Sequence, residues 1–158
     1  MEPITRRTIL AGAGAAALLS RPALATPPRP LRLPDAEWRK RLSPAAFDVL
    51  RRDGTERPFS SLLNDEHRTG RFSCAGCALP LFASSTKFDS GTGWPSFWTH
   101  LPDAVAQRGD ATLGMVRTEV RCARCDGHLG HVFDDGPRPT GLRYCMNGVA
   151  MRFQPGRA

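Results

Sequence analysis

The sequence predicts a mainly antiparallel β domain preceded by two small helices. Three observations support this fold class. Helix signals, with capping residues and suitably spaced apolar side chains, are confined to residues 35–54. After Gly54, glycine and proline recur every few residues and the apolar runs become short, which is typical of strands joined by turns. Residues 114–121 alternate between apolar or hydroxyl side chains and charged ones, which is the pattern of a half-buried strand.

Residues 1–25 carry the pattern of an export signal. Two adjacent arginines, Arg6 and Arg7, precede an uncharged apolar stretch at residues 8–19. Ala23-Leu24-Ala25 follows with the small-x-small pattern of a signal-peptidase site. The apolar stretch is shorter than the roughly 20 residues that span a bilayer. We therefore expect a twin-arginine signal that is cut after Ala25 and a periplasmic protein; the alternatives are a membrane anchor or a disordered basic tail.

The remaining residues have the length of one ordinary domain. Cleavage would remove three arginines and one glutamate, lowering the formal net charge from +7 to +5. The arginines that remain are scattered, which favours a solvated surface over a nucleic-acid site. No membrane-spanning segment is expected beyond residue 25. We therefore expect neither a nucleic-acid partner nor stable membrane association after cleavage.

The first elements can be assigned from proline positions and capping residues. Residues 26–34 hold four prolines and are predicted to form an extended linker before a domain at residues 35–158. Residues 35–42 suit a short helix with Asp35 as its cap. A second helix is defined by Ser43 as its cap, Pro44 in its first position, Phe47 and Leu50 on one face, and Gly54 at its end.

Strands are expected towards the C-terminus. The alternating segment at residues 114–121 places Val116, Thr118 and Val120 on one face of a strand. Residues 134–137 form a predicted turn because they read Asp-Asp-Gly-Pro. Two more strands are expected at residues 142–147 and 149–153.

Two C-x-x-C pairs offer four thiolates, which matches the tetrahedral ligand set of a structural zinc. The four residues are Cys74, Cys77, Cys122 and Cys125. Because 44 residues separate the pairs, one Zn²⁺ per chain would tie distant segments together and contribute directly to folding. Gly76 and Gly127 stand where such turns often need a positive φ. Two local disulfides, or one redox-active C-x-x-C, are the alternatives.

The fifth cysteine needs a different explanation. Cys145 lies at residues 143–147, in the segment Arg-Tyr-Cys-Met-Asn. It is either an inert buried thiol or a nucleophile. Two other segments hold groups with chemical capacity: residues 91–98 display three aromatic side chains on a glycine-rich turn, and residues 127–133 contain two histidines. A single cysteine with histidines elsewhere is a candidate nucleophile and acid pair.

Three motifs in this order and spacing resemble the B-type methionine sulfoxide reductases. They are Gly-Trp-Pro-Ser-Phe at 93–97, Cys-x-x-Cys-x-x-His-Leu-Gly-His-Val-Phe at 122–133, and Arg-Tyr-Cys-x-Asn at 143–147. The match extends from Trp38 to Phe153 and includes Gly-Thr-Glu at 54–56. The resemblance implies two antiparallel sheets, a four-cysteine zinc, and reduction of the R epimer of methionine sulfoxide, free or in proteins, as repair of oxidative damage.

The chemistry of that reaction suggests a role for each candidate side chain. Cys145 as a thiolate would attack the sulfoxide sulfur and become a sulfenic acid. His131 resembles the family's acid, and its ordinary titration range suits proton transfer near neutrality. His128 would help to position the oxygen or a water. For both histidines, a purely structural role is the alternative.

Substrate-binding groups follow from the same motifs. Asn147 and Arg143 share a strand face with Cys145, so that Asn147 can orient the substrate and Arg143 can favour the thiolate. Trp94 resembles the family's aromatic wall for the substrate methyl group, and Phe133 is a second aromatic candidate. An ordinary surface charge is the alternative for Arg143.

One position departs from the family pattern. Many members carry a second, resolving cysteine just before Gly-Trp-Pro, where this chain has Thr92. Threonine cannot form the intramolecular disulfide. We therefore expect a cycle with one cysteine, in which a thioredoxin-like protein or a small thiol reduces the Cys145 sulfenic acid.

Two other function classes are compatible with parts of the sequence. A zinc-ribbon module could bind an acidic partner through its basic surface, but this leaves Cys145, His131 and Trp94 without a role. A thiol–disulfide oxidoreductase could use one C-x-x-C. It predicts that mutation of Cys74 or Cys122 abolishes activity and leaves the fold intact, whereas a structural zinc predicts unfolding.

Overall fold

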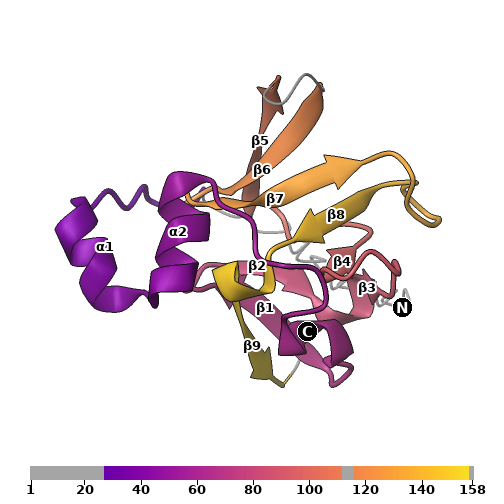
Figure 1. Cartoon of the computed structure of the whole chain (residues 1–158). Coiled ribbons are helices and arrows are strands. Elements are labelled where there is room, and N and C mark those ends of the chain that lie inside the picture. The colour runs from indigo at the N-terminus through magenta and orange to yellow at the C-terminus, as the bar shows by residue number, and fades with distance from the viewer. Residues whose placement is uncertain (1–26, 112–115, 157–158) are drawn as a thin grey trace, which may run out of the picture.

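The computed structural model describes residues 27–111 and 116–156. Within them the protein is mainly β, with two short α-helices before the strands, as the sequence predicts (Figure 1). The helices are α1 (Asp35–Arg41) and α2 (Pro44–Arg52), with short 3-10 helices η1 (Leu62–Asp65), η2 (Ser84–Thr86) and η4 (Gly148–Ala150). The strands are β1 (Gly70–Cys74), β2 (Pro80–Ala83), β3 (Lys87–Phe88), β4 (Ser96–Phe97), β5 (Val105–Asp110), β6 (Arg117–Cys122), β7 (His128–Phe133), β8 (Arg143–Met146) and β9 (Met151–Pro155).

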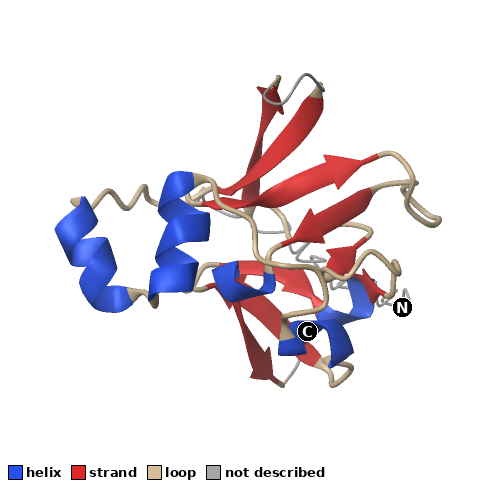
Figure 2. Ribbon diagram, in the orientation of Figure 1, coloured by secondary structure: helices blue, strands red, loops and turns tan. Residues whose placement is uncertain are grey.

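These strands form two antiparallel sheets. The smaller sheet has the order β2-β1-β9 and the larger one the order β3-β4-β8-β7-β6-β5. Most of the larger sheet lies above the smaller one in the view of Figure 2. Three phenylalanines join the sheets: the Phe97 ring of β4 stacks on Phe82 of β2 at 4.3 Å between centroids and meets the edge of Phe72 of β1 at 4.9 Å. All three are fully buried, so the hydrophobic core lies between the two sheets.

The second helix forms as its sequence predicts. The Ser43 hydroxyl accepts a hydrogen bond from the Ala46 amide at 3.2 Å, and Pro44 occupies the first turn. Phe47 and Leu50 are buried on one face. The helix ends at Asp53, whose φ of 57° takes the left-handed conformation that ends many helices, one residue before Gly54.

The cap predicted for the first helix is wrong. Pro34, not Asp35, is the N-cap residue, and Asp35 is already helical with no capping bond from its side chain. The Pro34 carbonyl accepts hydrogen bonds from Glu37 and Trp38, at 3.0 and 3.2 Å, because its extended backbone aims that oxygen into the first turn. Trp38 packs into the core.

The proline-rich linker is extended but not detached. Residues 27–34 have no regular secondary structure, yet the Leu31 amide donates to the Arg124 carbonyl at 2.7 Å, and Leu31 and Leu33 pack on the core. Residue 26 and the predicted export signal at residues 1–25 lie outside the described residues. Among the described helices, none has the length and apolar character needed to cross a bilayer.

Two strand boundaries differ from expectation. β6 begins at Arg117; Val120 is buried and Thr118 half-buried, but Val116 is 92% exposed, and residue 114 lies outside the described part. Val149 belongs to η4 rather than to a strand, because the chain must turn there before β9 can pair with β1. The predicted turn at residues 134–137 falls in the loop between β7 and β8.

Candidate active site

The four cysteines of the two C-x-x-C pairs meet in one cluster. Cys74 and Cys122 end β1 and β6, and the partner of each follows in a turn. The Sγ atoms of Cys74 and Cys125 lie 3.6 Å apart, and those of Cys77 and Cys122 lie 3.5 Å apart, so each pair reaches across to the other. All four thiols are buried. The cluster therefore joins the two sheets at one end of the molecule.

The geometry of the cluster suits a tetrahedral metal ion. All four Sγ atoms lie within 4.8 Å of one another. Zinc–sulfur bonds of about 2.3 Å in a tetrahedron place neighbouring sulfurs about 3.8 Å apart, close to the separations here. Hydrogen bonding with Cys122 raises the pKa of Cys74 and lowers that of Cys125. This cluster could hold a metal ion.

The glycines of the two motifs serve packing rather than backbone conformation. The expected positive φ is not at Gly76 or Gly127 but at Ala78, with φ 59°, and at Asp126, with φ 57°. A Cβ at Gly127 would lie 2.8 Å from the Leu50 side chain. The turns must therefore approach the buried side of the helices closely. This close approach, rather than the backbone conformation of the turn, accounts for the glycines at these two positions.

Cys145 and His131 face one another across two neighbouring strands. His131 of β7 is directly opposite Cys145 of β8, and Cys145 is in turn opposite Ser96 of β4. Side chains of directly opposed residues project from the same face of a sheet. His131 and Cys145 both line a cavity of about 140 Å³. Its other lining residues are Thr55, Trp94, Arg117, Gly130, Phe133 and Asn147. The sheet register thus brings the predicted nucleophile and acid together.

His131 is held by a carboxylate that no motif in the sequence indicates. Its Nε2 lies 2.8 Å from Asp110 Oδ2 of β5, and the same oxygen accepts from the Arg117 guanidinium at 2.8 Å. All three side chains are largely buried. Asp110 therefore fixes the orientation of the His131 ring, and Arg117 stabilises the carboxylate. In the sequence, Asp110 and Arg117 are indistinguishable from solvated charges.

His128 lies beside His131 but does not line the cavity. Its ring meets that of His131 edge to face at 5.4 Å between centroids, and its Nδ1 lies 2.6 Å from Glu119 Oε1. Burial lowers the pKa of His128, although Glu119 opposes this effect. The Arg121 guanidinium also contacts that Glu119 oxygen, at 2.6 Å. The structure thus supports contact between His128 and the proposed acid, and the predicted contact with substrate stays a prediction.

Arg143 is oriented by two neighbours. Its guanidinium forms two hydrogen bonds of 2.8 Å to the carboxylate of Asp135, and its Cζ lies 4.4 Å from the centre of the Phe133 ring. Hydrogen bonding to Asp135 raises the pKa of Arg143, and the nearby Cys145 raises it further. A permanent positive charge is thus placed near the predicted nucleophile.

Asn147 and Trp94 are both tied to Glu56. Asn147 Oδ1 accepts from the Glu56 amide at 3.0 Å, and its Nδ2 donates to the Leu129 carbonyl at 3.1 Å. The Trp94 indole nitrogen donates to the Glu56 carbonyl at 3.1 Å. The segment at residues 55–56 therefore closes the cavity and fixes two of its walls. Its only sequence signal was the match at residues 54–56.

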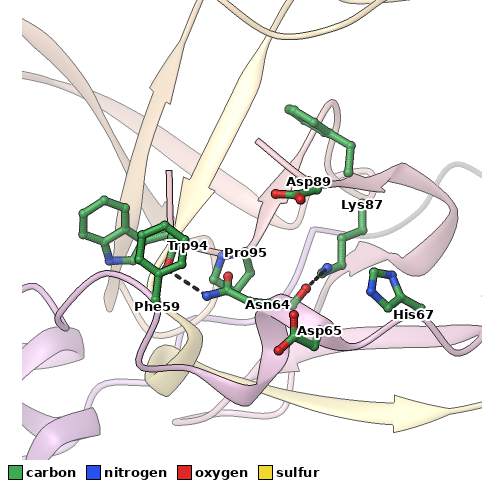
Figure 3. A pocket seen from close by; sticks show the side chains of 10 residues that line it. Phe59, Asn64, Asp65, His67, Lys87, Asp89, Trp94 and Pro95 are labelled. Carbon is green, nitrogen blue, oxygen red and sulfur yellow. Dashed lines mark hydrogen bonds between the residues drawn. The ribbon is translucent and has the colours of Figure 1, made fainter. Parts of the chain in front are cut away.

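A second cavity, of about 130 Å³, is lined in part by Gly93, Trp94 and Pro95 (Figure 3). In it, Lys87 donates to the Asn64 carbonyl at 2.6 Å, and the Asn64 amide donates to the Gly93 carbonyl at 2.8 Å. Burial lowers the pKa of Lys87. These bonds anchor the turn that carries Trp94.

Comparison with known proteins identifies the family to which the two sheets and their site belong. A family model described as the SelR domain matches residues 42–155. The chain belongs to the B-type peptide methionine sulfoxide reductases. It is 57% identical to peptide methionine sulfoxide reductase MsrB of Thiobacillus denitrificans over 122 residues, or 77% of this chain and 92% of that protein. It is 56% identical to the MsrB of Agrobacterium fabrum over 122 residues, 77% of this chain and 90% of that protein, and 55% identical to the MsrB of Thioalkalivibrio sulfidiphilus over 127 residues, 80% and 93%.

The SelR match contains every residue of the cysteine cluster and of the cavity. It also contains Thr92. The first helix and the linker precede it. The family relationship therefore concerns the two sheets and the site that they carry.

Proposed function

We propose that this protein reduces the R epimer of methionine sulfoxide, free or in proteins, to methionine and thereby repairs oxidised proteins. One observation carries the proposal: Cys145 and His131 are opposed in the sheet and line the same cavity, which Trp94 walls. A sulfoxide needs a nucleophile for its sulfur and a proton for its oxygen, and these two residues supply them. The names of the similar proteins agree with this activity.

The proposed reaction transfers one oxygen atom and two electrons. The Cys145 thiolate attacks the sulfoxide sulfur, and His131, oriented by Asp110, protonates the oxygen as the sulfur–oxygen bond breaks. The oxygen ends on Cys145 as a sulfenic acid, and methionine leaves. Arg143, near Cys145, favours the thiolate that starts the reaction.

The cavity walls account for substrate orientation. Trp94 and Phe133 offer apolar surface to the methyl group and the side chain of the sulfoxide. Both ends of the Asn147 side-chain amide are hydrogen-bonded to backbone groups, so this amide is a polar group of fixed orientation in the cavity wall. A cavity with one apolar wall and one polar wall can distinguish the two epimers at sulfur, because only one epimer presents its oxygen to His131.

Regeneration requires a reductant from outside the chain. The four cysteines other than Cys145 belong to the four-cysteine cluster. Thr92 stands where the family resemblance implies a resolving cysteine in many members. An external thiol, either a thioredoxin-like protein or a small molecule, would attack the sulfenic acid, release water and form a mixed disulfide. A second thiol would then free Cys145.

The cluster is proposed to hold one structural Zn²⁺ per chain through Cys74, Cys77, Cys122 and Cys125. Four buried thiols at tetrahedral separations support this choice. Bound zinc would keep these thiols as thiolates and protect them from oxidation. The protein needs this protection if it is exported, since the periplasm oxidises exposed thiols.

Export is proposed from the first 25 residues. The adjacent arginines, the short apolar stretch and the small-residue site are those of a twin-arginine signal, so the mature protein would begin at residue 26, in the linker before the domain at residues 35–158. No stable membrane association is expected after cleavage. The intact mass of the protein recovered from the periplasm tests this: a form that retains Met1 to Ala25 contradicts it.

The activity is tested with the two epimers of a methionine sulfoxide substrate and dithiothreitol as reductant. We expect the zinc-loaded protein to reduce the R epimer and to leave the S epimer unchanged. Both free methionine sulfoxide and a peptide containing it should be assayed, because both are proposed substrates. Failure to reduce the R epimer in both forms contradicts the proposed function.

A further inference from the structure

A chain of hydroxyl groups runs from Cys145 into the protein. The Thr92 hydroxyl lies 3.7 Å from Cys145 Sγ, within hydrogen-bonding distance of a sulfur, and 2.8 Å from the Ser90 hydroxyl. The Ser90 hydroxyl is 2.8 Å from that of Ser96, which reaches the Trp94 carbonyl at 3.1 Å. Four consecutive contacts thus connect the candidate nucleophile to a backbone carbonyl.

Each hydroxyl carries one hydrogen, so the hydrogen bonds along this series of hydroxyl groups can run in either of two directions. In one, Ser96 donates to the Trp94 carbonyl, and Ser90, Thr92 and the Cys145 thiol each donate to the next group. In the other, Ser96 donates to Ser90, Ser90 to Thr92, and Thr92 to the sulfur. The first polarity suits a thiol, and the second suits any form of Cys145 that needs a donor, such as a thiolate.

The loop that carries these hydroxyl groups is anchored by hydrogen bonds: the Phe59 amide and the Asn64 side chain both donate to the Gly93 carbonyl, at 2.7 and 2.8 Å. Gly91 and Gly93, on either side of Thr92, have φ values of 69° and 91°, which favour glycine. A Cβ at Gly93 would lie 2.8 Å from the Phe59 backbone nitrogen. On the sheet side, the Met146 amide donates to the Pro95 carbonyl at 3.0 Å, next to Cys145. These contacts anchor the backbone on the C-terminal side of Thr92, next to Cys145.

We propose that Thr92, Ser90 and Ser96 form a reversible hydroxyl relay that donates a hydrogen bond to the Cys145 thiolate and then to the oxygen of its sulfenic acid. Thr92 contacts the reacting group, while Ser90 and Ser96 are positioning residues that set its polarity. The inference rests on the proposed function and deepens it. In this chain a hydroxyl, not a second thiol, lies beside Cys145, and we infer that it holds the oxidised cysteine until an external thiol arrives.

Other charged groups face Cys145 and must be considered with the relay. His131 approaches from β7 with Asp110 behind it, Arg143 lies on β8 with Asp135, and Arg117 of β6 also lines the cavity. The hydroxyl groups of the relay carry no charge, and they approach Cys145 from β4 and the loop that precedes it. A change at Thr92 leaves these ionised groups in place, so its effect on Cys145 can be measured separately.

The test compares Thr92→Val with Thr92→Ser. Valine has the shape of threonine but no hydroxyl, and serine keeps the hydroxyl. We expect Thr92→Val to lower kcat/KM about tenfold, the usual effect of losing one hydrogen bond to a charged group, whereas Thr92→Ser stays near wild type. Ser90→Ala, which interrupts the relay one step further on, should change kcat/KM in the same direction but by less. Thr118→Val makes the same substitution on β6, outside the relay, and should leave kcat/KM unchanged.

A second readout follows the thiolate without turnover. The rate of Cys145 alkylation by iodoacetamide is measured against pH by peptide mass, and the curve is expected to move to higher pH in Thr92→Val but not in Thr92→Ser. A Thr92→Val protein with wild-type kcat/KM and an unmoved alkylation curve overturns the relay. Alkylation needs no substrate, so it tests the relay independently of the proposed activity. A wild-type protein that reduces neither epimer would contradict the proposed function, and the alkylation curves would still test the relay.

Discussion

Replacing Cys145 by serine is expected to lower the rate of methionine sulfoxide reduction more than about a thousandfold, since the serine hydroxyl is a far weaker nucleophile and cannot take up the oxygen as a sulfenic acid. The substitution is nearly isosteric, and Cys145 lies in a half-buried position of β8, outside the hydrophobic core. The measurement is kcat/KM for the R epimer with dithiothreitol.

Folding of this variant provides the control. Cys145→Ser should keep the thermal unfolding midpoint and metal content of the wild-type protein, because the residue is not among the four cysteines of the cluster. Residual activity within tenfold of wild type would show that another group performs the chemistry, and the assigned role of Cys145 would be wrong.

Removing the proposed Zn²⁺ is expected to unfold the domain. Structural zinc in four-cysteine sites contributes roughly 10 kcal/mol or more to folding, which is comparable to the whole stability of an ordinary domain, about 5–15 kcal/mol. The cluster joins the end of β1 to the end of β6, in different sheets, and α2 packs on its turns. We expect Cys122→Ser, or strong chelation of the wild-type protein, to abolish cooperative unfolding measured by circular dichroism.

The same experiment separates structural zinc from redox chemistry. Cys145→Ser is the matched cysteine substitution outside the cluster and should unfold cooperatively. If a C-x-x-C were the redox centre, Cys122→Ser would lose activity and retain a wild-type unfolding curve. That combination, or a purified wild-type protein without stoichiometric zinc, would contradict the structural role.

Local signals predicted the elements that depend on neighbouring residues. Ser43 and Pro44 begin α2 as expected, because a cap and a first-turn proline act within one helical turn. Grouping of the four cysteines was likewise predictable, because two C-x-x-C pairs commonly supply the four ligands of one metal ion. Asp35 shows the limit: its residue type suits a cap, but the extended backbone of Pro34 takes that position.

Contacts set by strand register could not be predicted from the sequence. Asp110 reaches His131 only because β5, β6 and β7 are neighbours in one sheet, and the sequence gives no sign of this contact between two residues 21 positions apart. Glu56 binds Asn147 across 91 positions of the chain. The hydroxyl relay depends in the same way on β4 lying beside β8, which places Ser96 opposite Cys145.

The competing interpretation as a zinc-ribbon binding module explains the cluster and leaves the cavity unexplained. A binding module has no need for a thiol opposite a histidine that is itself held by a carboxylate. Membership of the B-type reductase family, shown by the SelR match, removes the main reason to prefer it. The basic charge of the chain is then a property of its solvated surface.

A single-turnover experiment tests whether Cys145 alone reduces the sulfoxide, without an internal partner. The zinc-loaded protein is mixed with excess R sulfoxide, without reductant but with dimedone, which traps sulfenic acids, and is then analysed by peptide mass spectrometry. We expect one methionine formed per chain and one dimedone adduct, on Cys145, with the four cluster cysteines unmodified. A disulfide linking Cys145 to any cluster cysteine, or methionine formed without a change at Cys145, would contradict it.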